Sequence, residues 1–252
     1  MTAPLEPRSV LIIGATGGIG QALLAATRSR WPKASIVAAA RRPPAPGSSD
    51  AADASVRWCT LDLLEPAHAT ALADALAEDQ TPDLVFVATG FLHNERFAPE
   101  KSLRQLSADA FAYSFSINAS GPLLVLQALD RVLTRRAPDP QQRCRVMVLS
   151  AKVGSISDNG LGGWYAYRMA KAALNMGVRN LGHEYTRNAR KPVVVAVHPG
   201  TTFSPLSDPF AKKGLATVDA ATTADRLIAL AERLDDSHQG GFFHWDGSRL
   251  PD

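Results

Sequence analysis

The stretch that decides the fold reads Val10-Leu11-Ile12-Ile13-Gly14-Ala15-Thr16-Gly17-Gly18-Ile19-Gly20. Its first four residues are apolar, which predicts a buried strand, and the helical pattern of residues 18–30 follows directly. Glycines at 14, 18 and 20 allow a tight turn with no Cβ to block a pyrophosphate at the amino end of that helix. Alone this is weak evidence, because ordinary strand–helix turns are also rich in glycine. Because the glycine loop follows the first strand of a repeating strand–helix pattern, it predicts a nucleotide site. The contacts are expected from Gly14, Thr16, Gly17, Gly18, Ile19 and Gly20.

The rest of the chain repeats this alternation of short apolar runs and longer amphipathic ones. The runs predicted as strands are residues 9–13, 35–39, 56–61, 83–88, 145–149 and 193–198. Those predicted as helices are residues 18–30, 66–78, 108–136, 164–185 and 218–233. Apolar strands that alternate with helices form parallel sheets covered on both faces. We therefore predict the α/β class, as a Rossmann-type doubly wound parallel sheet with helices on both faces. Ligands are expected beyond the carboxyl ends of its strands.

Composition indicates one domain. The chain has 252 residues, of which 46% are hydrophobic and 20% charged, and no Ser/Gly-rich linker divides it. We therefore expect residues 1–252 to form a single domain, which the glycine loop predicts to bind a nucleotide. Cys59 and Cys144 lie in apolar segments and are expected to be reduced core thiols, which fits a reducing compartment. With no signal segment and no run near the ~18 apolar residues of a membrane span, we expect a cytoplasmic protein without a membrane partner.

Charge and histidine content argue against two other kinds of site. The net charge of +3 comes from basic residues scattered among acids, without the aromatic interleaving of a single-strand binder. No nucleic-acid partner is therefore expected, and a mildly basic surface suits an anionic cofactor. The six histidines are dispersed, and His183-Glu184 lacks the second histidine of a zinc-binding helix, so no metal site is expected.

The residues after the second predicted strand bear on which dinucleotide is bound. An NAD site needs an acid there for the ribose 2′-hydroxyl, whereas the 2′-phosphate of NADP needs a cation. Here Ala40 is followed by Arg41 and Arg42, and an arginine can bind a phosphate as a bidentate fork. Alternatively, both arginines only solvate the start of a loop. The pattern favours NADP(H) over NAD(H).

Further candidates follow the third and fourth predicted strands. Asp62, with Leu63 beside it, could accept a hydrogen bond from the adenine amino group, or it could cap the helix that begins near Pro66. Gly90 would let the backbone approach the cofactor ribose, or it is a plain turn glycine.

Tyr167 and Lys171 are spaced by one turn of the predicted helix 164–185. A free tyrosine phenol titrates near pH ~10 and is a poor acid or base at neutral pH. A lysine ammonium one turn away would stabilise the phenolate and lower that pKa. Taken alone, the pair could be an accident of a helix surface. Together with a nucleotide loop, it indicates a centre of proton transfer.

In combination, these residues resemble the short-chain dehydrogenase/reductase family over nearly the whole chain. The motifs come in the family's order: the Gly14/Gly18/Gly20 loop, Asp62, Gly90, Asn118, Tyr167-x-x-x-Lys171 and His198-Pro199-Gly200. The stretches 153–159, 165–175 and 241–247 are similar to the C-factor and carbonyl-reductase-like subgroup.

The resemblance implies the chemistry of three residues. Tyr167 would donate a proton to a carbonyl, or accept one from an alcohol. Lys171 would lower the pKa of Tyr167 and hydrogen-bond the nicotinamide ribose. Asn118 would interrupt its helix and hold a water that links Lys171 to solvent, unless it is an ordinary polar residue in a long helix.

The resemblance also implies the surroundings of that chemistry. Pro199, Gly200 and Thr202 would shape the site of the nicotinamide amide. Residues 203–216 would cover the substrate as a lid, although they also suit a simple surface loop. A homodimer or homotetramer would pair the long helices 108–136 and 164–185.

One departure from the family concerns the serine that polarises the substrate carbonyl. The family places it three residues before the glycine that is Gly154 here, and that position is Ala151. Ser150 is one place earlier, where strand alternation would point it to the opposite side. Ser150 is our first choice for the hydroxyl, Ser155 and Ser157 are the alternatives, and the enzyme could also work without one.

The sequence thus predicts an NADP(H)-dependent oxidoreductase that interconverts a small-molecule carbonyl and a secondary alcohol. The alternative is a dinucleotide-binding signalling or regulatory protein, similar to C-factor, with little turnover.

Overall fold

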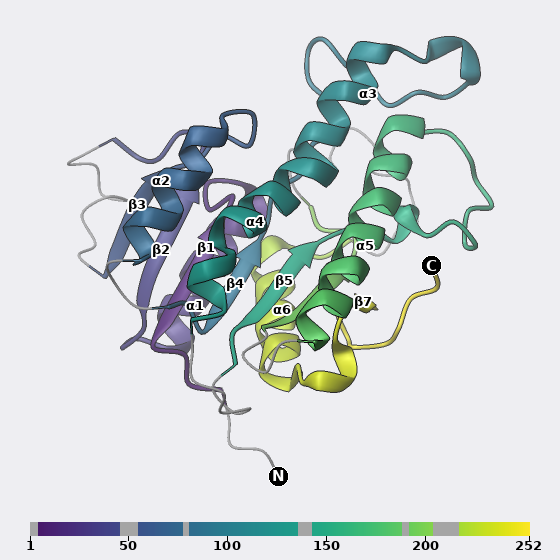
Figure 1. Ribbon diagram of the computed structural model, residues 1–252. Helices are drawn as coiled ribbons and strands as arrows, with labels where there is room; N and C mark the ends of the chain where they lie inside the picture. Colours follow the sequence, from purple (N-terminus) through teal and green to yellow (C-terminus); the bar gives the residue numbers. More distant parts are fainter. Residues whose placement is uncertain (1–4, 46–54, 78–80, 136–142, 188–191, 204–216) are drawn as a thin grey trace.

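A computed structural model describes residues 5–45, 55–77, 81–135, 143–187, 192–203 and 217–252. One parallel sheet has the strand order β3-β2-β1-β4-β5-β6-β7 (Figure 1). The strands are β1 (Ser9–Ile13), β2 (Ser35–Ala40), β3 (Val56–Thr60), β4 (Leu84–Val87), β5 (Arg145–Leu149), β6 (Val193–His198) and β7 (Phe242–His244). Because β1 pairs with both β2 and β4, the winding direction reverses between β1 and β4. A crevice at the carboxyl ends of the strands is expected at this reversal.

Helices cover both faces of the sheet, as the sequence predicted. They are α1 (Gly18–Arg30), α2 (Pro66–Ala77), α3 (Ala108–Phe115), α4 (Gly121–Leu133), α5 (Tyr165–Thr186) and α6 (Ala220–Arg233). Figure 1 shows α2, α4 and α5 in front of the sheet, with α1 and α6 behind it. Strand alternation sends Leu11 and Ile13 into the core under the first group, and Val10 and Ile12 into the core under the second. The doubly wound α/β fold is therefore confirmed.

Several boundaries differ from the sequence prediction for local reasons. The predicted helix 108–136 is two helices, because a π-helical turn at Ser116–Ser120 separates α3 from α4. Helix α4 ends at Leu133. Arg136 and Glu78, the predicted last residues of the helices 108–136 and 66–78, lie outside the described residues. The helix predicted from residue 218 begins at Ala220, because the Asp219 side chain caps it by accepting from the Thr222 amide at 2.7 Å.

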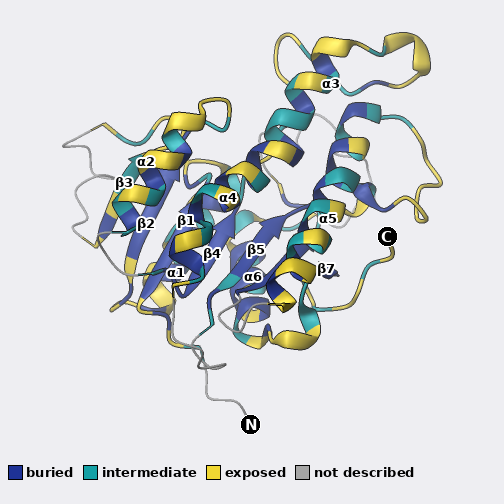
Figure 2. Ribbon diagram, viewed as in Figure 1, coloured by how far each residue is buried: buried dark blue, intermediate teal, exposed yellow. Residues whose placement is uncertain are grey.

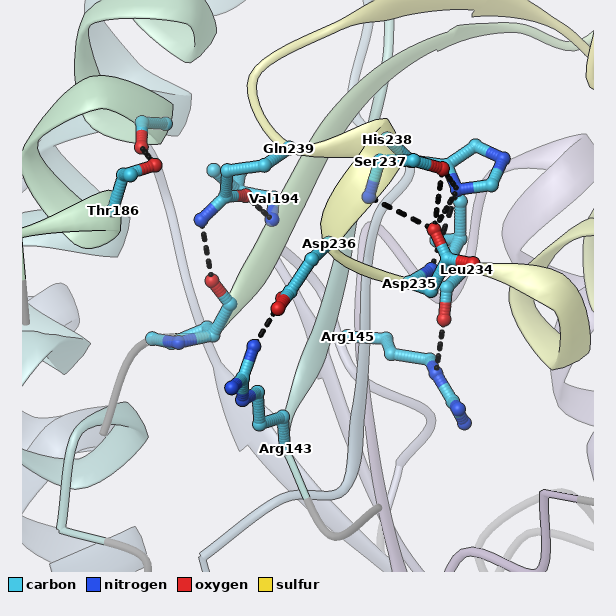
Figure 3. A network of polar contacts seen from close by, with 12 residues as sticks. Arg143, Arg145, Thr186, Val194, Leu234, Asp235, Asp236, Ser237, His238 and Gln239 are labelled. Carbon is cyan, nitrogen blue, oxygen red and sulfur yellow. Dashed lines mark hydrogen bonds and ion pairs between the residues drawn. The ribbon is translucent and has the colours of Figure 1, made fainter. Parts of the chain in front are cut away.

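The edge strand β7 was not predicted, and hydrogen bonds and an ion pair with the amino ends of β5 and β6 hold the segment before it (Figure 3). Arg143 forms an ion pair with Asp236, and Arg145 Nε donates to the Leu234 carbonyl at 3.0 Å. Gln239 accepts from the Val194 amide at 2.7 Å and donates to the Pro192 carbonyl at 2.9 Å. These bonds fix the connection between α6 and β7, so that β7 pairs with β6 in parallel.

The connection from β4 to α3 leaves the body of the fold near the carboxyl edge of the sheet. Figure 2 shows buried strands in the centre of the molecule and exposed positions along much of this connection. Among the described helices, none has the length and apolar character needed to span a bilayer.

Candidate active site

The glycine loop at the end of β1 is shaped by close backbone contacts. Gly14 has φ +85°, and a Cβ there would lie 2.8 Å from the Ala88 carbonyl oxygen. A Cβ on Gly20 would lie 2.0 Å from the Gly14 carbonyl oxygen, so neither position accepts a side chain. Gly17 is the N-cap of α1, without a side-chain cap and without an acid in the first turn. The positive end of α1 is therefore open to an anion, as a pyrophosphate requires.

The other predicted residues of the loop lie around this helix end. Thr16 and Gly17 are exposed at the tip, Gly18 opens α1, and Ile19 packs against the core behind the sheet. The buried hydroxyl of Thr89, at the neighbouring end of β4, has no hydrogen-bond partner among the described residues. An unsatisfied polar atom beside an anion-binding turn fits a bound dinucleotide.

The predicted residues at the ends of β2 and β3 lie on the same edge of the sheet. Arg41 and Arg42 follow β2 directly and are exposed, and neither forms a hydrogen bond or ion pair with the described part of the chain. One carboxylate oxygen of Asp62 accepts from the Leu64 amide at 3.0 Å, which forms an Asx turn shortly before α2. Leu63 packs against Gly121 of α4, where a Cβ would lie 2.9 Å from the Leu63 Cβ.

Asn118 lies fully buried in the π-helical turn between α3 and α4. Its Oδ1 accepts from the Phe91 amide at 2.9 Å, and its Nδ2 donates to the Phe91 carbonyl at 2.7 Å. The local interruption of the helix at Asn118 is thus present. The Asn118 side chain thus fixes the backbone of Phe91, the residue after Gly90. Gly90 itself is exposed and lies beyond the end of β4.

Tyr167 and Lys171 lie one turn apart near the start of α5. Tyr167 is half-buried and lines a small pocket of about 10 Å³ with Phe91, Phe97, Pro99 and Glu100 of the β4–α3 connection. Lys171 is only 2% exposed, and its Nζ donates to the carbonyl oxygen of Leu149 at 2.9 Å. Because Leu149 is the last residue of β5, the amine lies at the carboxyl edge of the sheet. The Lys171 Nζ is 6.0 Å from the centroid of the Tyr167 ring.

Burial sets the protonation of both groups in the protein without cofactor. It raises the pKa of the Tyr167 phenol from 10.0 to about 12. It lowers the pKa of the Lys171 amine from 10.5 to about 7. The direction for Tyr167 is opposite to the sequence expectation, because removal from water disfavours the phenolate, and the Lys171 amine, with a pKa of about 7, is uncharged at the pH where the phenol ionises. Tyr167 is therefore a neutral phenol at pH 7.

The three serines considered for carbonyl polarisation all bind protein oxygens. Ser150 is 5% exposed, and its Oγ donates to Asn175 Oδ1 at 2.6 Å, two turns of α5 beyond Tyr167. Ser155 and Ser157 donate to the backbone oxygen of Asp252 at 3.3 and 2.7 Å. The hydroxyl of Ser150, the first choice from the sequence, thus points toward Asn175 in the distal part of α5.

The residues that follow β6 lie at the same carboxyl edge of the sheet. Gly200 has φ +87°, and a Cβ there would lie 3.2 Å from the Trp245 indole. Pro199 is buried, and the Thr202 hydroxyl lies 2.9 Å from that of Thr223 on α6. Of the predicted lid 203–216, only Phe203 is described, and it is 59% exposed. The rest of the predicted lid lies outside the described residues. Among the residues that the structure describes, no group of three or more His, Cys, Asp or Glu side chains could hold a metal ion.

The chain matches a family model described as enoyl-(acyl carrier protein) reductase over residues 14–233. A protein named C-signal from Myxococcus xanthus is 34% identical over 140 residues, which cover 56% of this chain and 77% of the relative. The chain belongs to the short-chain dehydrogenase/reductase family. A 1-hydroxy-2-glutathionyl-2-methyl-3-butene dehydrogenase from Rhodococcus sp. is 27% identical over 247 residues, 96% of this chain and 98% of the relative. Family membership and these relatives support oxidoreductase activity.

Solved structures of this short-chain dehydrogenase/reductase fold superpose closely on the chain. The NADPH-bound carbonyl reductase from chicken fatty liver has a TM-score of 0.84 at 23% identity, covering 98% of this chain and 100% of that one. The carbonyl reductase Sniffer of D. melanogaster has a TM-score of 0.82 at 20% identity, covering 97% and 99%. At such identities the likeness shows the fold alone.

Sequence reasoning missed three residues that the structure brings to the site. Glu100 contacts the first turn of α5, Asn175 holds Ser150, and Trp245 packs on Gly200. Glu100 and Asn175 lie far along the chain from their partners, and neither forms a spaced motif with them. Asn175 and Trp245 lie within the subgroup-like stretches 165–175 and 241–247, but that likeness assigned neither of them a role.

Lys171→Met is expected to stabilise the protein without cofactor by roughly 2–4 kcal/mol at pH 7, because it removes a buried amine. The pKa of Lys171 is lower in the folded protein than in an unfolded chain. Between about pH 7 and 10.5 the unfolded chain therefore holds the extra proton, and stability of the wild-type protein rises with pH. The advantage of the variant should shrink across this window. Urea unfolding at several pH values measures it.

Lys101→Met, at an exposed lysine, is the matched control and should leave both stability and its pH dependence unchanged. A Lys171→Met protein with the same pH dependence as the wild type would contradict the burial of a titrating amine.

Proposed function

We propose that this chain is an NADP(H)-dependent oxidoreductase that interconverts a small-molecule carbonyl and a secondary alcohol, with Tyr167 as the proton donor or acceptor. The observation that carries the proposal is the pair on α5. Tyr167 lines a pocket, while Lys171 lies buried behind it at the carboxyl edge of the sheet. A dinucleotide bound on the loop 14–20 would supply or accept the hydride.

Protonation favours the reducing direction for the chemistry of Tyr167. A phenol with a pKa of about 12 is protonated at pH 7 and can donate its proton to the oxygen of a reduced carbonyl. The Lys171 amine, with a pKa of about 7 and its Nζ 6.0 Å from the centre of the Tyr167 ring, would supply a replacement proton at neutral pH. Asn118 would connect this route to solvent through a water, from a buried turn that packs against α5.

Tyr167 is also the principal hydrogen-bond donor to the substrate carbonyl in this proposal. Ala151 provides no hydroxyl, and Ser150 would act through Asn175 rather than on the substrate. Ser150 would then position α5 relative to the end of β5. This makes the reaction depend on Tyr167 more than on any serine.

The cofactor preference in the proposal rests on Arg41 and Arg42. Both side chains are exposed at the end of β2, where the adenosine ribose of a dinucleotide on the loop 14–20 would lie. Neither guanidinium is engaged by the described residues, so both are available for a 2′-phosphate. Asp62 and Leu63 would flank the adenine, and Gly90 the ribose. Pro199, Gly200 and Thr202 would contact the nicotinamide amide.

A second function is favoured by one comparison. The 34% identity with a protein named C-signal supports a dinucleotide-binding signalling or regulatory protein with little turnover. The absence of a hydroxyl at Ala151 also fits weak catalysis. This alternative predicts tight NADPH binding without oxidation by any member of a broad carbonyl panel.

We also propose a homodimer or homotetramer in the cytoplasm. The exposed apolar side chains Leu124, Met169 and Met176 of α4 and α5 support an assembly through these helices. The small residue Gly177 acts within the chain instead, because a Cβ there would lie 2.3 Å from Leu123 of α4. No disulfide joins Cys59 and Cys144, which suits a reducing compartment.

Tyr167→Phe should lower kcat for carbonyl reduction by about 100-fold or more, because it removes the proton donor while keeping the ring. Ser150→Ala should lower it less than about tenfold, because the hydroxyl acts at a distance. NADPH consumption with a panel of aldehydes and ketones measures both. Full turnover by Tyr167→Phe would overturn the assigned chemistry.

Arg41→Ala is expected to weaken NADPH binding by about 10- to 100-fold, because hydrogen bonds to a charged phosphate are lost. NADH binding should change less than about twofold, since NADH has no 2′-phosphate. Cofactor fluorescence titrations of the wild type, Arg41→Ala and the exposed control Arg104→Ala measure the difference. A wild-type preference for NADH would contradict the assignment of Arg41.

A further inference from the structure

Glu100 is a carboxylate that the fold buries on a connection with many exposed positions. Its neighbours Lys101 and Ser102 are exposed, and so is much of the segment from Asn94 to Arg104, whereas Glu100 is only 4% exposed. Burying a carboxylate is costly unless hydrogen bonds compensate for the lost water. The contacts of Glu100 therefore indicate what this burial achieves.

Both the backbone and the side chain of Glu100 bind the first turn of α5. The Glu100 carbonyl oxygen accepts from the Trp164 amide at 2.5 Å, and its Oε2 accepts from the Ala166 amide at 3.2 Å. These amides lie on either side of Tyr165, and Tyr167 follows Ala166 directly. A residue from a distant connection thus holds the turn that carries Tyr167.

The first turn of α5 has no cap of its own. Its N-cap residue Trp164 has φ 52°, in the left-handed region, and its side chain makes no cap hydrogen bond. There is also no acid in the first turn. The Glu100 carboxylate takes the place of an N-cap side chain and puts a negative charge at the positive end of the helix.

The same connection is fixed at its other end by Asn118. Asn118 makes two hydrogen bonds with the backbone of Phe91, and Phe91, Phe97 and Pro99 line the pocket with Tyr167. The pocket wall is therefore tied to Asn118 at residue 91 and to the turn of Tyr167 at residue 100.

We propose that Glu100 is a positioning residue for the reaction, which fixes Tyr167 relative to the pocket wall by capping α5 from the β4–α3 connection. The proposal rests on the assignment of Tyr167 as the acid/base. A displacement of a catalytic group by about 1 Å can cost on the order of 100-fold in rate. Glu100 would therefore act on kcat, through the position of Tyr167, more than on cofactor binding.

The test compares Glu100→Ala, Glu100→Gln and the exposed control Glu95→Ala from the same connection. Glu100→Ala should lower kcat by about 10- to 100-fold, with KM and the NADPH dissociation constant changed less than about threefold. Glu100→Gln keeps an oxygen that can accept from the Ala166 amide, so it should recover kcat to within about threefold of the wild type. Glu95→Ala should behave as the wild type.

A second readout is independent of turnover. Amide hydrogen exchange of the cofactor-free protein should be at least about tenfold faster at Ala166 in Glu100→Ala than in the wild type, and near the wild-type rate in Glu100→Gln. Faster exchange with an unchanged kcat would overturn the proposal, as would unchanged exchange in Glu100→Ala. If the wild type turns over no carbonyl, the proposed function fails, and the exchange at Ala166 alone decides whether Glu100 holds the turn.

Discussion

The hydrogen bond from the Lys171 amine to the Leu149 carbonyl is the interaction on which the rest of the site depends. An amine that is 2% exposed must find an acceptor, and the last carbonyl of β5 provides it at 2.9 Å. The approach requires a glycine next to α5, because a Cβ on Gly154 would lie 2.8 Å from the Lys171 Cβ. It thereby fixes α5 against the carboxyl edge of the sheet, and Tyr167 with it.

Two further contacts complete the position of α5 from different directions. Ser150 binds Asn175 on the far side of Lys171, and Glu100 binds the first turn before Tyr167. The helix is therefore held on both sides of the pair by residues of other elements. Burial of the Lys171 amine is costly, and its hydrogen bond to Leu149 offsets part of this cost while it fixes the place of Tyr167.

The sequence alone predicts those features of the fold and of the site that depend on the local pattern of residues. The limits of β1 and α1 match the prediction, because apolar strand residues, a glycine turn and a helical period all agree there. The spacing of Tyr167 and Lys171 likewise gives their placement on one helix. The three-residue strand β7 is too short for a period to show, and it depends on contacts such as Gln239 with Val194. The direction of the Tyr167 pKa shift depends on burial, and the partner of Ser150 is a residue far along the chain. The spacing of residues in the sequence reveals neither.

The most direct test is an NMR titration of the Lys171 side chain in the cofactor-free protein. Selective 13C labelling at lysine Cε, with Lys171→Met to assign the signal, follows its ionisation. The account predicts a midpoint near pH 7, because the buried amine has a pKa of about 7. A midpoint near 10.5, the ordinary value of a solvated lysine, would contradict it.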